Sequence, residues 1–299
     1  MMMSSSSPYQ QSVSWRQAWP FLAVPLALYC LLLVYPLLQV LWLSVWDGRD
    51  NVYAPSFVGL ANYQRLWQHP TFVKSLGNSL AFLVTLLPCL LVLPTLVAYH
   101  AYKAPSQSLS TIVRAIVYLP VLVPMVVSAL LWQWLLQGDG LINTLLKQVG
   151  IASVPWLTSV QWVIPAISLV IVWKALGYYM MMVFSHLVTL PTEQDEAALL
   201  EGASAWQRFY YITLPQLRGI LTTVAIVATM GTIKLFSEVY VLTRGGPLHT
   251  SDTLLLFIYT QAFSWLDFGL ASAAGVVFAV LLITLTLLQY RLQGKRPLA

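Results

Sequence analysis

One acidic segment stands out as able to bind another molecule. Glu193–Gln216 reads EQDEAALLEGASAWQRFYYITLPQ, with four carboxylates in its first nine residues, although only 8% of the chain is charged. Asp195 and Glu196 suit the first turn of a short helix, where the dipole favours negative charge, and Thr192 can cap it. Gly202 then permits a sharp turn. We refer to residues 189–215 as the acidic loop.

A second amphipathic helix is predicted after this turn, over about Ala203–Tyr211. It carries Trp206, Phe209 and Tyr210, and Pro215 marks the approach to the next apolar stretch. Aromatic side chains beside charges are typical of protein interfaces. The segment is therefore either a solvated interfacial loop or a docking surface for a partner.

Ionisable residues inside long apolar stretches form a second group of candidates. Lys174 lies near the middle of one stretch, and Lys234 and Glu238 are four residues apart in another, which puts them on one helical face. A charge in a lipid environment costs about 2.5–3.5 kcal/mol on insertion scales, which makes such residues functional candidates. Lys174 is expected to face a cavity or a partner charge. Lys234 and Glu238 either form an ion pair with each other or line a polar path.

Hydroxyl and aromatic groups nearby extend this second group, although Ser and Thr also make ordinary helix–helix contacts in membranes. The candidate path residues are Lys174, Tyr178, Thr229, Thr232, Lys234, Ser237 and Glu238.

The sequence lacks the usual signs of catalysis, metal binding or nucleotide binding. It contains no H-E-x-x-H, no G-x-S-x-G and no G-x-x-x-x-G-K-[ST] phosphate loop. None of the four histidines makes an H-x-x-x-H pair. Cys30 and Cys89 both lie in apolar runs, so a disulfide framework is not expected. We therefore predict neither a cofactor nor a metal in this chain.

Composition identifies an integral membrane protein. Of the 299 residues 59% are hydrophobic, and the mean hydropathy is +0.75. Soluble domains have about 45–50% apolar and 25% charged residues, so this composition could not cover a soluble surface. The net charge of +5 is attributed to membrane orientation, because no basic cluster suggests nucleic acid.

Six segments are long enough to cross a bilayer, which takes about 20 residues each, and all are predicted to be helices. We expect an all-α membrane domain over residues 16–292, a disordered tail over 1–15, a terminal tail over 293–299 and an uncleaved first span. The predicted spans are Trp19–Val45, Ser79–Tyr99, Val113–Leu136, Gln161–Val188, Gly219–Leu242 and Phe268–Tyr290.

Lysine and arginine predict the orientation, because they are enriched on the cytoplasmic side. With both termini and the acidic loop inside, eight basic residues are cytoplasmic against five outside. The external connections, Trp46–Asn78, Gln137–Val160 and Thr243–Asp267, are predicted to form short interfacial helices. The inner set is Arg16, Lys103, Arg114, Arg208, Arg218, Arg291, Lys295 and Arg296; the outer set is Arg49, Arg65, Lys74, Lys147 and Arg244.

The acidic loop resembles a known signature. Glu196-Ala197-Ala198, three residues, Gly202, nine residues, Ile212, one residue and Leu214-Pro215 match the EAA motif of binding-protein-dependent ABC importer permeases of type I, with a MetI-like transmembrane domain. Members commonly have Asp before the glycine, where this chain has Glu201.

Other stretches resemble the carbohydrate-uptake subfamily, of MalF/UgpA type. They are Phe57–Tyr63 (FVGLANY), Tyr240–Pro247 (YVLTRGGP) and Phe268–Ala273 (FGLASA), and together the similarity covers about residues 15–290. Glycerol-3-phosphate and other polyol or sugar-phosphate importers share these patterns. An intramembrane enzyme or a membrane scaffold are the alternatives from other classes.

The resemblance implies that the acidic loop couples this chain to a separate ATPase in the inner membrane of a bacterium or archaeon. The implied partners are two ABC ATPases that bind ATP and Mg²⁺, a second homologous permease, an external solute-binding protein and a sugar. The implied coupling residues are Glu196, Ala197, Ala198, Glu201, Gly202, Ala203, Trp206, Phe209, Ile212, Leu214 and Pro215.

Overall fold

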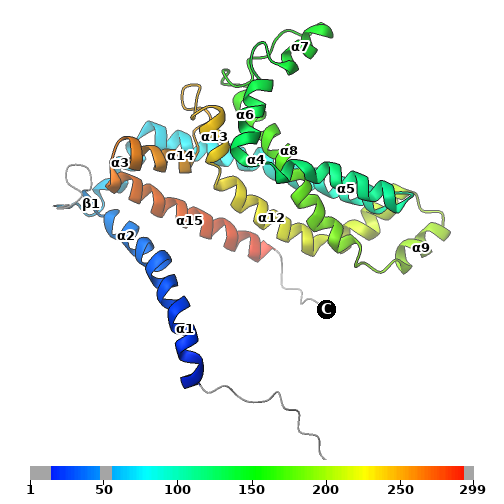
Figure 1. Ribbon diagram of the computed structural model, residues 1–299, viewed down its shortest axis with the longest axis horizontal. Coiled ribbons are helices and arrows are strands. Elements are labelled where there is room, and N and C mark those ends of the chain that lie inside the picture. The colour runs from blue at the N-terminus through cyan, green and yellow to red at the C-terminus, as the bar shows by residue number, and fades with distance from the viewer. Residues whose placement is uncertain (1–14, 48–55, 293–299) are drawn as a thin grey trace, which may run out of the picture.

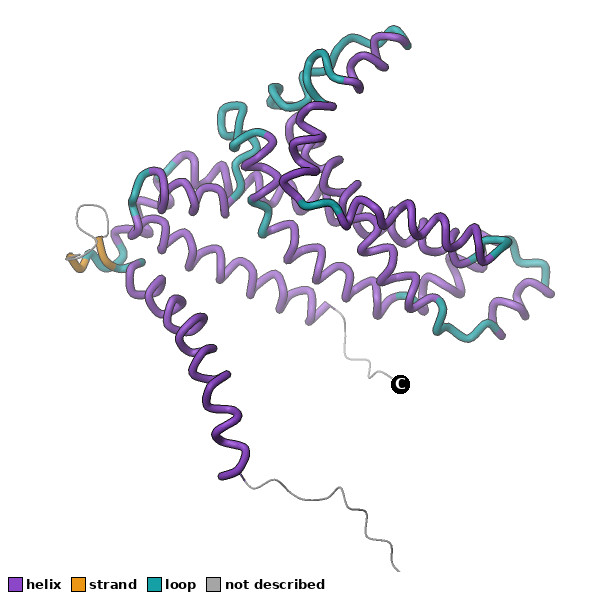
Figure 2. Tube along the Cα trace, viewed as in Figure 1, coloured by secondary structure: helices purple, strands orange, loops and turns teal. Residues whose placement is uncertain are grey.

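The computed structural model describes residues 15–47 and 56–292. The predicted tails, 1–15 and 293–299, lie outside these residues apart from residue 15, where the first helix begins. The described chain is mostly helical, with one small pair of strands near the end of the first helix (Figure 2).

The first helix is apolar and stands away from most of the molecule (Figure 1). Its second part, α2, contacts α15, and none of the apolar window over Trp19–Leu43 is buried in the single chain. An apolar helix of this length with no buried face suits a lipid surface. Its parts are α1 (Trp15–Tyr29), the π-helical turn η1 (Cys30–Val34) and α2 (Tyr35–Leu43).

A short hairpin and a helix connect this segment to the bundle. Strand β1 (Trp46–Asp47) pairs antiparallel with β2 (Ser56–Phe57), and α3 (Ala61–Gln68) follows. The buried Asn62 amide donates to the carbonyls of Ser44 and Trp46 at 3.0 and 2.9 Å, which ties α3 to the hairpin. A short helix is found here as expected, its place at the membrane interface stays a prediction, and the hairpin was not predicted.

The core of the bundle forms where α4 (Pro70–Tyr102), α8 (Val163–Leu187) and α12 (Arg218–Ile233) pack together. Helix α4 begins nine residues before the predicted span. Half of the apolar window of α8 is buried, because this helix contacts α4, α5 and α12.

The predicted third span is broken in the structure. Helices α5 (Gln107–Leu122) and α6 (Met125–Leu135) meet at an angle of 97°. Val123 is extended and Pro124 precedes α6, consistent with the preference of a residue before proline for extended backbone. Helix α7 (Leu141–Gln148) then lies in the predicted external connection.

The predicted fifth span is also interrupted. Helix α12 ends at Ile233, and a separate helix α13 (Ser237–Leu242) begins after a non-helical step. The chain that enters α12 is bent from it by 70°. Before α12 lie α9 (Glu193–Leu200), α10 (Ala205–Arg208), the π-helical turn η2 (Phe209–Thr213) and α11 (Leu214–Gln216).

The last part of the chain forms α14 (Leu254–Tyr259), the π-helical turn η3 (Thr260–Ser264) and α15 (Phe268–Leu292). Among the described residues, four helices are long and apolar enough to cross a membrane, and six spans result if each bent pair counts as one. A mostly helical fold with four to six candidate membrane spans is thus found, while the count of six spans stays a prediction.

Candidate functional site

The acidic loop lies at one end of the bundle, remote from the hairpin (Figure 1). Helix α9 places Glu193, Asp195 and Glu196 in its first turn, as predicted from the helix dipole. The predicted cap is wrong: Thr192 has helical backbone angles and its side chain accepts no capping hydrogen bond.

A Schellman turn ends α9. The amide of Ala203 donates to the carbonyl of Ala198 at 2.9 Å, and that of Gly202 donates to Leu199 at 3.1 Å. Gly202 has φ +84°, a conformation that glycine adopts without a Cβ penalty. The predicted glycine turn is confirmed.

The next helix is longer than predicted and begins with a capping box. The Ser204 hydroxyl accepts from the amide of Gln207 at 3.3 Å, and the Gln207 side chain accepts from the amide of Ser204 at 2.7 Å. From there the chain stays helical through η2 and α11, so Pro215 lies inside the helical run. Phe209 is buried against Tyr99 of α4, with ring centroids 4.6 Å apart, and anchors this run to the bundle.

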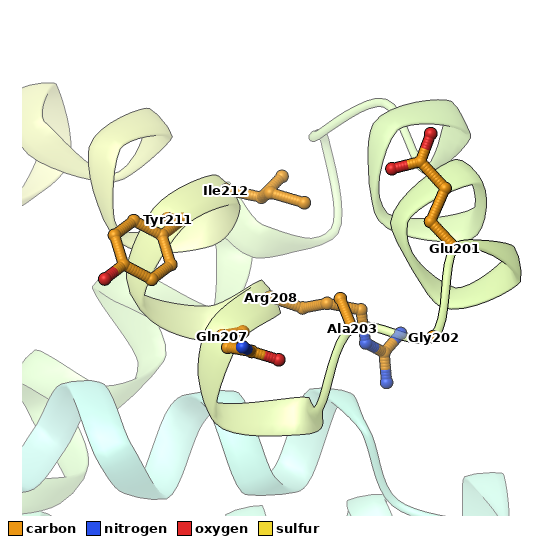
Figure 3. Close-up of a pocket in the computed structure, with 7 residues that line it drawn as sticks. All are labelled: Glu201, Gly202, Ala203, Gln207, Arg208, Tyr211 and Ile212. Carbon is orange, nitrogen blue, oxygen red and sulfur yellow. The ribbon is translucent and has the colours of Figure 1, made fainter.

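Several side chains of the acidic loop remain open to a partner. Trp206 is 66% exposed and Leu200 is 90% exposed, and Glu196 and Glu201 are also exposed. A hollow of about 380 Å³ separates the end of α9 from the next helix (Figure 3). Its lining consists of Glu201, Gly202, Ala203, Gln207, Arg208, Tyr211 and Ile212.

The predicted coupling residues therefore lie in one continuous segment, from α9 to α11. Glu196, Ala197 and Ala198 lie on α9, and Glu201, Gly202 and Ala203 form the turn. Trp206 lies on α10, Phe209 and Ile212 on η2, and Leu214 and Pro215 on α11.

The candidate path residues lie on three helices. Lys174 and Tyr178 belong to α8, Thr229 and Thr232 are buried on α12, and Ser237 and Glu238 begin α13. Gln289 of α15, which the sequence did not suggest, donates to the Thr229 hydroxyl at 2.5 Å. A path through these residues stays a prediction.

The predicted shared face of Lys234 and Glu238 is wrong. Lys234 caps the end of α12 and Glu238 lies in the first turn of α13, so no single helix carries both. Within the described residues no ion pair joins them, and Glu238 interacts electrostatically with Lys174 instead.

Comparisons with known proteins identify the family of this chain. The family described as "Binding-protein-dependent transport system inner membrane component" matches residues 91–297. The chain belongs to this family. It is thus a transport subunit, a permease, rather than an intramembrane enzyme or a scaffold.

Two relatives cover nearly the whole permease. The lactose transport system permease protein LacF of Rhizobium radiobacter is 31% identical, over 91% of this chain and 92% of LacF. The trehalose/maltose transport system permease protein MalF of Thermococcus litoralis is 32% identical, over 85% of this chain and 86% of that protein.

The fold of the permease is shared with a solved structure. A chain in the crystal structure of a bacterial ABC transporter involved in the import of the acidic polysaccharide alginate superimposes with a TM-score of 0.81 at 22% identity. The match covers 93% of the permease and 96% of that chain.

Lys174 of the permease has a defined role in the broken helix. Its ammonium donates to the carbonyls of Pro120 and Val123 at 3.3 and 2.5 Å, at the end of α5, where the Pro120 carbonyl also accepts from the Val123 amide at 3.3 Å. The lysine thus meets the polar backbone exposed by the break.

Lys174→Met is expected to destabilise the permease by about 1–3 kcal/mol, because it removes the hydrogen bonds from a charged donor to two part-buried carbonyls. The measurement is denaturation in detergent, in which unfolding is monitored as the loss of monodisperse protein. Lys234→Met, at an exposed helix end, is the matched control and is expected to unfold like wild type. Equal stability of the two variants would contradict this role for Lys174.

The opposite end of the permease carries a cleft of about 480 Å³, where one ion pair and one hydrogen bond between a histidine and a carboxylate hold the loops. Arg65 of α3 pairs with Asp267 at 2.5 Å, and His249 hydrogen bonds Asp252 at 2.6 Å. Burial raises the pKa of Asp252, and the hydrogen bond with His249 offsets part of this rise. The cleft is lined by Arg65, His69, Thr71, Arg244, His249, Asp252, Phe257, Thr260, Gln261, Trp265, Asp267 and Leu270.

His69 in this cleft is expected to make stability depend on pH. Burial first, and then the nearby Arg65, lower its pKa below 6.5. The unfolded chain therefore binds a proton at a higher pH than the folded chain, and stability falls as the pH drops from about 7.5 to 5.5.

His69→Gln should make thermal stability fall less over this pH range, whereas His100→Gln, at an exposed position of α4, should keep the wild-type dependence. Melting temperatures in detergent at both pH values test this. An identical pH dependence in wild type and His69→Gln would contradict the assignment.

Proposed function

We propose that this permease forms half of the translocation pathway of an ATP-driven importer for a sugar or oligosaccharide. The support comes from relatives that cover most of the chain and are named for lactose and for trehalose/maltose transport. The importer lies in the inner membrane of a bacterium or archaeon, with a solute-binding protein delivering the sugar from outside.

The acidic loop is the part that couples the permease to ATP hydrolysis. The observation that carries this proposal is α9 itself, a short helix at one end of the bundle with exposed Leu199 and Leu200 and a glycine turn at its end. Such a helix can enter a cleft on another protein. This end of the bundle is cytoplasmic, in line with the excess of lysine and arginine on that side.

The chemistry of ATP belongs to partner chains. Two ABC ATPases bind ATP and Mg²⁺, and a second, homologous permease completes the pathway. When the ATPases close, they move α9 and switch the permease pair between its inward-facing and outward-facing states. ATP shifts the equilibrium between the inward-facing and outward-facing states only through contacts that differ between these two states.

Co-purification and ATPase activity test the proposal together. The permease is expressed with its neighbouring transport genes, purified through a tag and reconstituted in lipid. We expect recovery of an ATPase and a second permease, with ATP hydrolysis stimulated by a sugar-loaded binding protein. Recovery of the chain alone under gentle detergent conditions would contradict the proposed function.

A further inference from the structure

Helix α9 is held to the bundle by polar contacts. None of its residues, all of which the structure describes, is buried, so apolar packing does not fix its position. Asp195 is its most enclosed acid, with a side chain only 16% exposed, whereas Glu193 and Glu196 are exposed.

Asp195 joins three elements through one oxygen. Its Oδ2 accepts from Lys103 Nζ at 2.7 Å and from Arg208 Nη1 at 2.9 Å. Lys103 caps the end of α4, and Arg208 is the last residue of α10. Hydrogen bonds between charged groups are shorter and stronger than neutral ones.

The pair of Asp195 and Arg208 is shielded from water. The two side chains are 16% and 15% exposed, whereas Lys103 is 34% exposed. Screening by solvent and salt is weaker for enclosed pairs, so this contact retains more of its strength than a surface pair.

The rest of the acidic loop is anchored differently. Phe209 packs on Tyr99 of α4, and both side chains are buried, so α10 and η2 are fixed by apolar contact. Helix α9 has a further contact in the exposed hydrogen bond from Gln216 to Gln194, at 3.0 Å. Asp195 is therefore the most enclosed connection between α9 and the anchored helices.

We propose that Asp195 is the positioning residue that makes the acidic loop a rigid lever. Through Lys103 and Arg208 it fixes the direction of α9 relative to α4, so that a push on α9 moves the bundle instead of bending the loop. This inference rests on the proposed function for its consequence in transport, but the rigidity of α9 belongs to this chain alone.

The first experiment measures that rigidity without any partner. Cys30 and Cys89 are replaced by alanine, and spin labels are placed at Leu200→Cys on α9 and Val84→Cys on α4, which are 90% and 74% exposed. Pulsed electron paramagnetic resonance on the full chain in lipid nanodiscs then gives the distribution of distances between the two spin labels.

Asp195→Asn is expected to broaden this distribution clearly, because α9 then samples several directions. Glu193→Gln removes the same charge from the same helix and should leave it narrow, and Asp195→Glu should restore most of the narrow distribution. Lys103→Met removes one of the two contacts and should broaden it partly, which serves as a second test if Asp195→Asn does not fold. A narrow distribution in both Asp195→Asn and Lys103→Met overturns the proposal.

The second experiment uses the assembled importer. Asp195→Asn is expected to co-purify with the ATPases but to lower the sugar transported per ATP by about fivefold, the lower end of typical coupling energies. Glu193→Gln should keep the wild-type ratio. An unchanged ratio of sugar transported to ATP hydrolysed in Asp195→Asn overturns the proposal that Asp195 makes the acidic loop a rigid lever. If wild type captures no ATPase, the proposed function fails, and the distance measurement still decides whether Asp195 positions α9.

Discussion

Replacing Gly177 with alanine is expected to cost the permease about 2 kcal/mol or more, the upper part of the usual range for overpacking. A Cβ at this position would lie 2.7 Å from the Cα of Tyr118 and still closer to the carbonyl oxygen of Val117. These are backbone atoms of α5 and have no rotamer that avoids the clash. Helices α5 and α8 would have to separate.

The separation would disturb neighbouring contacts on the same face of α8. Lys174 lies three residues before Gly177 and holds the carbonyls at the end of α5. Phe184 lies seven residues after it, and the Arg114 guanidinium sits 4.3 Å from the centre of its ring. Residues at this spacing share one helical face, so an added methyl group at the centre weakens both flanking contacts.

Denaturation in detergent measures the effect of Gly177→Ala. Gly77→Ala is the matched control, since a Cβ at Gly77 of α4 meets nothing within 4 Å. That control is expected to match wild type or to gain up to about 1 kcal/mol from helix propensity. Stability of Gly177→Ala within the range of the control would show that α5 and α8 tolerate a wider spacing.

Much of this architecture was predictable because it depends on length and hydropathy. Apolar stretches of about 20 residues must form helices in lipid, where the backbone has no other partners. The turn at Gly202 was also predictable, since a short acidic helix followed by glycine has a local signature. Its Schellman hydrogen bonds confirm that prediction.

The breaks were less predictable because tertiary contacts decide them. Pro88 and Pro94 lie inside the continuous α4, whereas the chain turns by 97° at Pro124. At the second place Lys174 donates to the carbonyls of Pro120 and Val123. Sequence spacing alone does not reveal that contact, which joins residues 51 and 54 positions apart.

The same limit explains the errors in the candidate path. Spacing of four residues predicts a shared face only while the helix continues, and α12 ends between Ile233 and Lys234. The junction at Asp195 was missed for a related reason. Its partners lie 92 and 13 residues away, although their opposite charges at the same end of the predicted spans were a usable signal.

Replacing Gly202 with aspartate is expected to uncouple the importer while the permease still inserts into the membrane. Gly202 has φ +84°, so a side chain there strains the turn that ends α9. It would also add a carboxylate beside Glu201 on the surface that faces the ATPase in the proposed function. Within this chain a Cβ at Gly202 meets nothing within 4 Å, so the bundle itself should be unaffected.

We expect Gly202→Asp to lower sugar-stimulated ATP hydrolysis by about tenfold or more, which corresponds to losing roughly 1.4 kcal/mol of coupling. Gly202→Asn is the matched variant, because asparagine has nearly the same size and also tolerates left-handed backbone. Any difference in ATP hydrolysis between the two variants then reports the effect of the added charge. The loss of ATP hydrolysis that both variants share reports the backbone strain and the close approach of the partner. If Gly202→Asp hydrolyses ATP with the wild-type dependence on sugar and binding protein, α9 and its turn do not couple this permease to its ATPase.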